Sequence, residues 1–159
     1  RTLERNREES LKWLEKSVEG DSESGKYVVT LQYLQNRNDT SNHQRGFGYL
    51  EEICPKYKDA THTLAICYEY GIGVKKDPYK AFELYSQSKD CRFPPAMYAA
   101  GRCFEEGIGT DVDLDEAKRL FEKAANGNQW HEGDVDAMNK LREFEEDKVR
   151  VKFRKKRFW

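Results

Sequence analysis

Residues 67–85 read CYEYGIGVKKDPYKAFELY, and residues 103–121 read CFEEGIGTDVDLDEAKRLF. The two stretches align at an offset of 36 residues without a gap. The shared positions are Cys67 and Cys103, Gly71 and Gly107, Gly73 and Gly109, Asp77 and Asp113, and Ala81 and Ala117. A period of this length is typical of repeat proteins, in which each repeat is one supersecondary unit.

One period predicts a helix, a glycine turn and a second helix. From Ala60 to Tyr70 the apolar and small residues recur with helical rather than alternating spacing. Gly71 then suits a left-handed helix cap. Asp77 followed by Pro78 is typical of an N-cap with proline at the first helical position.

Weaker copies flank the two clear ones. One lies 35 residues earlier, with Asn36 and Asn38 in place of the two glycines, and half a copy precedes it at an offset of 36. Ala137 and Met138 resemble Ala96 and Met97, but only after a five-residue insertion. We therefore expect helices near residues 3–19, 24–35, 42–54, 58–70, 77–89, 94–106 and 113–125, and a last one from about residue 134.

Stacking such pairs gives an all-α fold, because one pair cannot bury its own apolar face. Small residues such as Ala65 mark close helix crossings. The residues with a structural role in the repeat are Gly71, Gly73, Ala81, Gly101, Gly107, Gly109 and Ala117.

The glycines, alanines and aromatic residues at these offsets resemble the Sel-one-like repeat, a relative of the tetratricopeptide repeats. The resemblance is clearest over residues 59–94 and 95–127. It implies a right-handed α–α superhelix whose first helices line the concave face, and members that are mostly adaptors and scaffolds. We expect a repeat domain over residues 1–147 and a basic extension over 148–159.

The composition agrees with a folded, elongated repeat protein that has much surface for its volume. Only 37% of the 159 residues are hydrophobic, 36% are charged and the mean hydropathy is −0.99, yet 13% are aromatic. Abundant aromatic residues argue against disorder. No apolar run approaches the roughly 20 residues of a membrane helix. Because no Met opens the chain, we expect it to be an excerpt.

Several sequence patterns that resemble functional sites are explained better by a structural role. Asp111, Asp113, Asp115 and Glu122 have the acidic spacing of an EF-hand, but the position that requires glycine is Glu116. The Gly-x-Gly turns lack the third glycine and the preceding strand of a phosphate loop. The three histidines do not converge on a predicted metal site. The four cysteines form no C-x-x-C pair, so we expect core-filling thiols. We predict no catalytic residue, no metal and no cofactor.

The first candidate site is the concave face. First-helix positions that the repeat core does not use are His62, Ile66, Tyr70, Met97, Arg102 and Glu106. Exposed Ile66, Tyr70 and Met97 would suit a peptide or a partner helix. The alternative is that these residues pack against a neighbouring repeat.

The second candidate site is the C-terminal tail. It carries seven basic residues and no acid from residue 148 onwards: Lys148, Arg150, Lys152, Arg154, Lys155, Lys156 and Arg157. The other 21 basic and 29 acidic residues leave −8 on the rest of the chain. The tail could bind an acidic partner, nucleic acid or an anionic membrane, serve as a nuclear address, or be a solvated extension.

These features predict a non-enzymatic adaptor that binds a protein or peptide through its concave face. One alternative is a regulatory or substrate-recruiting domain of a larger enzyme, such as a kinase or ubiquitin ligase. Another is a nucleic-acid or membrane tether that acts through the tail. We expect a cytoplasmic protein, with the nucleus as the other location.

Overall fold

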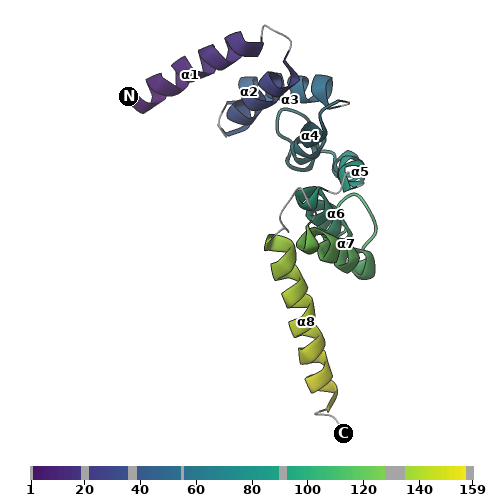
Figure 1. Ribbon diagram of the computed structural model, residues 1–159. Coiled ribbons are helices and arrows are strands. Elements are labelled where there is room, and N and C mark those ends of the chain that lie inside the picture. The colour runs from purple at the N-terminus through teal and green to yellow at the C-terminus, as the bar shows by residue number, and fades with distance from the viewer. Residues whose placement is uncertain are drawn as a thin grey trace. The chain divides into compact units, whose positions relative to one another are not determined.

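The computed structural model describes residues 2–18, 22–35, 39–54, 56–89, 93–127 and 135–156. In these ranges the chain forms eight helices and no strand (Figure 1). Each helix starts within about two residues of its expected position, so the all-α repeat prediction is confirmed. The helices are α1 (Thr2–Val18), α2 (Glu23–Gln35), α3 (Thr40–Ile53), α4 (Lys58–Tyr70), α5 (Pro78–Lys89), α6 (Pro94–Glu106), α7 (Leu114–Asn126) and α8 (Val135–Lys156).

The chain divides into two compact units, Arg1–Leu84 and Tyr85–Trp159. In the first unit α2 packs against α3, and α1 and α4 pack against this pair. In the second unit α6 packs against α7, and α8 packs against α7 (Figure 1). Among the described helices, none is both long and apolar enough to cross a bilayer.

The glycine turns form as the repeat predicts. Gly71 and Gly107 cap α4 and α6 with φ of 74° and 72°, and Gly73 and Gly109 also have positive φ. The backbone bonds repeat as well. The Ile72 amide donates to Cys67 and the Ile108 amide donates to Cys103, both at 2.9 Å. The glycine positions are thus set by backbone geometry that side chains rarely adopt.

The predicted caps of the second helices are also confirmed. The Asp77 carboxylate accepts a 3.0 Å hydrogen bond from the Lys80 amide at the start of α5. Asp113 accepts from the amides of Asp115 and Glu116 at 3.1 and 3.0 Å at the start of α7. Each cap satisfies amides that have no partner inside the helix.

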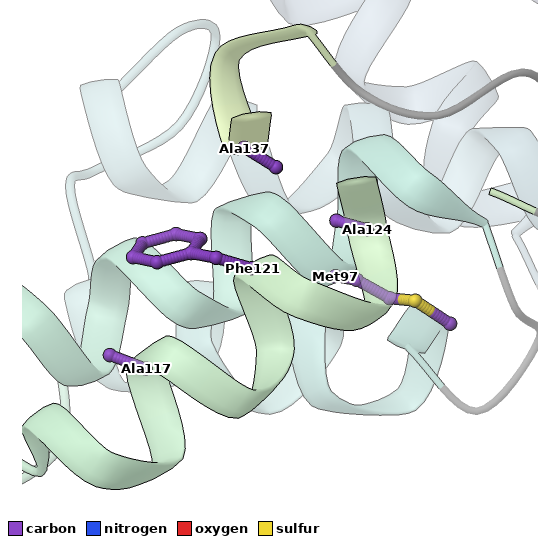
Figure 2. Close-up of a cluster of buried hydrophobic side chains, with 5 residues drawn as sticks. All are labelled: Met97, Ala117, Phe121, Ala124 and Ala137. Atoms are coloured by element: carbon purple, nitrogen blue, oxygen red, sulfur yellow. The ribbon is translucent and has the colours of Figure 1, made fainter. Parts of the chain in front are cut away.

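Figure 2 shows the core of the second unit, where side chains of α6, α7 and α8 meet. Phe121 is fully buried at its centre. Gly101 makes the close approach possible, because a Cβ there would lie 2.6 Å from the Phe121 ring. The buried members are Met97, Ala117, Phe121, Ala124 and Ala137.

The core of the first unit contains a cluster that we call the α1–α2 cluster, formed by Val18, Val29 and Tyr33. Leu11 and Leu14 of α1 and Tyr49 of α3 pack against it. These contacts join three consecutive helices, as expected of stacked repeats.

A polar cluster of Glu15, Tyr33 and Arg45, which we call the polar clasp, joins the same three helices. The Tyr33 hydroxyl donates to Glu15, and Arg45 donates to the same Glu15 oxygen at 3.2 Å while lying 5.4 Å from the Tyr33 ring centre. Burial, and then the hydrogen bond to Glu15, raise the pKa of Tyr33 above its ordinary value.

The clasp recurs one repeat later, where Glu51, Tyr68 and Lys80 take the three roles. The Tyr68 hydroxyl donates to Glu51 at 3.5 Å, and the Lys80 ammonium lies 4.5 Å from the Tyr68 ring centre.

Two of the cysteines fill the core, as predicted. Cys67 and Cys103 form no disulfide and have no exposed surface. Burial raises the pKa of Cys67 to about 12. Cys54 also forms no disulfide but is only half-buried. Cys91 lies outside the described residues.

Candidate functional site

The first helices of the first unit, α2 and α4, present an exposed apolar face. Val28 and Leu31 of α2 are 44% and 38% exposed, and Tyr70 at the end of α4 is 59% exposed. Residues three or four positions apart share one side of a helix, which applies to Val28 and Leu31 and to Ile66 and Tyr70. We call these four residues the apolar face.

Neighbouring contacts hold the two helices together beside this face. The hydroxyls of Tyr27 in α2 and Thr63 in α4 are hydrogen-bonded at 3.2 Å. The Tyr27 ring also lies 5.0 Å from the ring of Tyr57, which precedes α4. Burial raises the pKa of Tyr27. Tyr27 therefore ties α2 directly to α4 and to the residue that precedes it.

An ion pair anchors the other side of α2. Lys26 is 8% exposed, and its ammonium lies 2.5 Å from Glu52 of α3. Thr30 of α2 is fully buried and donates to the Lys26 carbonyl at 2.8 Å. The Lys26–Glu52 ion pair joins α2 to α3, whereas Val28 and Leu31 stay exposed.

In the second unit the positions level with Leu31 and Ile66 are charged, namely Arg102 of α6 and Glu143 of α8. The Lys140 ammonium lies 3.3 Å from Glu105 of α6 and 3.3 Å from Glu143. Burial alone would lower the pKa of Lys140, but the hydrogen bonds and charges of these two carboxylates outweigh it and raise that pKa. The second Glu105 oxygen is buried without a hydrogen-bond partner. This surface therefore favours polar or charged groups.

The predicted concave-face residues differ in their exposure. Tyr70 and Glu106 are exposed, whereas His62, Ile66 and Arg102 are half-buried. The expectation that Met97 is exposed is wrong, since it is 9% exposed and belongs to the core of α6, α7 and α8. The packing alternative holds for Met97, because Ala137 of α8 packs into the same cluster.

Sequence reasoning missed the exposure of Val28 in α2. The 35-residue offset, in contrast, places Leu31 of the weaker copy level with Ile66. That offset is the signal that assigns Leu31 to the predicted concave face.

The tail continues from the folded body as part of α8, which runs to Lys156 (Figure 1). The described residues do not include the tail side chains or Arg157, so tail binding stays a prediction. The run from Asp115 to Glu122 lies inside α7, where these carboxylates cannot wrap around one ion. In the described part of the chain no three acidic, histidine or cysteine side chains are placed to hold a metal ion.

Comparison with known proteins identifies the repeat. The model of the Sel1 repeat matches residues 2–22, 59–91 and 94–129, which is more than half of the chain. The unmatched stretch between residues 22 and 59 contains α2 and α3, the weaker copy. The crystal structure of a Sel1 repeat protein from Oxalobacter formigenes is similar, with a TM-score of 0.65 and 26% identity over 72% of this chain and 88% of that one.

Two curated relatives are regulators. Chitin synthase regulatory factor 2 of Schizosaccharomyces pombe is 29% identical over 86 residues, which cover 54% of this chain and 16% of that protein. Chitin synthase regulator SKT5 of Saccharomyces cerevisiae is 33% identical over 88 residues, which cover 53% of this chain and 12% of that protein. The chain therefore spans only a small part of these relatives.

Proposed function

This chain belongs to the Sel1 repeat family, and from that premise we propose that it is a non-enzymatic interaction module that holds a partner protein on its first helices. The observation that carries the proposal is the apolar face of α2 and α4. Large apolar side chains that are exposed together on a folded repeat are typical of a binding surface.

Each unit offers a surface of different chemistry. The apolar face of the first unit offers Leu31 and Tyr70 as contacts for aliphatic or aromatic side chains. The charged surface of α6 and α8 offers Arg102, Glu106 and Lys140 to polar groups. We propose that each surface, taken by itself, binds partner side chains of matching chemistry.

We propose further that the binding is regulatory. The names of both yeast relatives support this role, since each is a regulator of chitin synthase. The partner that we propose to test first is accordingly a chitin synthase. A catalytic domain elsewhere in the same protein is the competing source of the bound segment.

Site-specific photo-crosslinking tests the surface. A photoreactive phenylalanine analogue replaces Leu31 or Tyr70 on the apolar face, or Tyr79 of α5 as a control that is 74% exposed on a second helix. We expect positions 31 and 70 to crosslink to the same protein and position 79 not to do so. Equal crosslinking from all three positions, or none above background at 31 and 70, refutes the assignment.

A charge substitution tests the same surface without a crosslinker. Leu31→Glu places a carboxylate in the apolar face and should abolish the crosslink from position 70. Val112→Glu is the matched control, because Val112 is 60% exposed on the α6–α7 turn. Circular dichroism of both variants verifies folding.

A further inference from the structure

A surface hollow lies between the start of α3 and the glycine turn that follows α4, both within the first unit. Its volume is about 380 Å³. The α3 wall contains Thr40, His43 and Gln44, which are three or four positions apart and therefore share one side of the helix. The opposite wall contains Gly73 and Lys75 of the turn. We call this feature the α3–turn hollow.

The two walls are held close together by backbone packing. A Cβ on Gly73 would lie 2.3 Å from the His43 carbonyl oxygen and 3.0 Å from the Cβ of Phe47. The turn itself is fixed by the 2.9 Å hydrogen bond that the Ile72 amide donates to Cys67. The α3–turn hollow is therefore part of the folded backbone and does not depend on exposed side chains alone.

The His43 imidazole leaves a polar atom unsatisfied at this hollow. Its side chain belongs to a residue that is 9% exposed, and its Nε2 is buried without a hydrogen-bond partner among the described residues. A buried polar atom without a partner costs free energy. An imidazole nitrogen that carries the proton is a donor, so a ligand in the hollow that accepts hydrogen bonds can supply the missing partner.

The charge of the α3–turn hollow selects an anion. Lys75 is exposed, and among the described residues that line the hollow it alone carries a full charge at any pH near neutrality. Asp39 precedes α3, but its carboxylate accepts hydrogen bonds from the amide and the side chain of Asn42 at 3.1 and 2.6 Å. One lysine matches the single charge of a carboxylate, whereas a phosphate monoester carries about two charges.

We propose that the α3–turn hollow binds a carboxylate group of a peptide ligand, either an acidic side chain or a C-terminal carboxylate. Lys75 supplies the charge, and the Thr40 hydroxyl and the His43 imidazole supply hydrogen bonds. The turn after α6 lacks this chemistry, because Asp111 occupies the position of Lys75. The hollow is separate from the apolar face of α2 and α4, and the proposal stands without that assignment.

A titration of the full chain with small carboxylates tests the proposal. N-acetylglycylglycine presents a C-terminal carboxylate and N-acetylglutamate α-amide presents a side-chain carboxylate, each with its neutral amide as the control. Amide resonances in nuclear magnetic resonance spectra, recorded at constant ionic strength, report binding. We expect saturable shifts at Gly73 and Val74 with a Kd of about 10 mM or lower, and none at Gly109 and Thr110 of the second turn. The probe that binds more tightly identifies the source of the carboxylate.

Three variants make the test specific. Lys75→Asp introduces the residue of the second turn and should weaken binding at least about tenfold, because it removes a charge-assisted hydrogen bond. Lys76→Asp makes the same change of charge one residue away and should weaken binding less than about threefold, since exposed charges are screened. His43→Phe keeps a ring of similar size and should weaken binding at least about threefold. The amide spectrum of each variant verifies folding, and Lys75→Asp decides the test where His43→Phe does not fold.

Four outcomes overturn the proposal. The first is no saturable shift up to about 100 mM of either carboxylate. The second is equal binding of the neutral amides, or equal shifts at the second turn, because the shifts would then not report a carboxylate in the hollow. The third is an equal loss of affinity in Lys75→Asp and Lys76→Asp, or unchanged affinity in folded His43→Phe. The fourth is tighter binding of inorganic phosphate than of both carboxylates, which would assign the hollow to a different anion.

Discussion

Replacing Gly101 by alanine should destabilise the second unit, although alanine is the better helix former. Gly101 lies in the middle of α6, opposite the Phe121 ring. A Cβ there would lie 2.6 Å from Cε1 and 2.8 Å from Cδ1 of Phe121. The ring has no exposed surface, and the rings of Tyr98 and Phe144 lie 5.6 and 6.1 Å from it. The ring therefore has little space into which to move.

Two opposing contributions set the magnitude. Glycine to alanine in a helix interior gains about 1 kcal/mol. Overpacking a buried site costs about 1–3 kcal/mol, and the upper part of that range applies where a ring is confined on both sides. We therefore expect a net loss of about 1–2 kcal/mol. Gly48→Ala in α3 is the matched control, since a Cβ there meets nothing within 4 Å. That variant should gain about 0.5–1 kcal/mol from helix propensity alone.

Urea unfolding followed by far-ultraviolet circular dichroism measures both variants. The double variant Gly101→Ala/Phe121→Leu isolates the contact, because the added methyl should cost little once the ring is gone. A Gly101→Ala protein that is as stable as the parent would refute the reasoning. So would an equal loss in the Phe121→Leu background, because the cost would then not arise from the ring.

Four further predictions concern turns, caps and thiols. Gly73→Ala should destabilise more than Gly71→Ala in urea unfolding, because both have positive φ but only at Gly73 would a Cβ lie 2.3 Å from the His43 carbonyl oxygen. Asp113→Ala should lower the unfolding free energy by about 1 kcal/mol through loss of two amide bonds, whereas Asp111→Ala should leave it unchanged. Cys67 should resist iodoacetamide under native conditions while the half-buried Cys54 reacts, as mass spectrometry of the labelled peptides would show. The pKa of Cys67 is about 12 in the folded protein against an ordinary 9.0. Its neutral thiol therefore contributes fully to the unfolding free energy below pH 9, and this contribution should be lost as the pH rises towards 12. A Cys67→Ala protein whose unfolding free energy falls equally at alkaline pH would contradict this prediction.

The helices and turns could be predicted because their determinants are local. A glycine at positive φ and an aspartate before a helix act within a few residues, so a fixed offset reveals them. Gly71, Gly107, Asp77 and Asp113 are therefore all found where the repeat predicts.

Exposure could not be predicted as well, because it depends on distant segments. Met97 was expected on the surface, but the five-residue insertion before α8 hid the fact that Ala137 packs beside it. The polar clasp was missed for a related reason, since each copy draws on three helices. Its signal is present in the sequence as Glu15 and Glu51 at an offset of 36, and as Tyr33 and Tyr68 at an offset of 35.

The glycine turns separate backbone shape from surface chemistry. The turns after α4 and α6 share their backbone hydrogen bonds, including those from Asp77 to Tyr68 and from Asp113 to Phe104, both at 2.9 Å. Yet their equivalent exposed positions hold lysines in the first turn, and aspartate and valine in the second: Lys75 and Lys76 against Asp111 and Val112. Because glycine and a capping aspartate alone hold the loop, mutation can reverse its charge at little cost to folding. Each turn is thus a position where a repeat protein can evolve a new specificity while its scaffold stays the same.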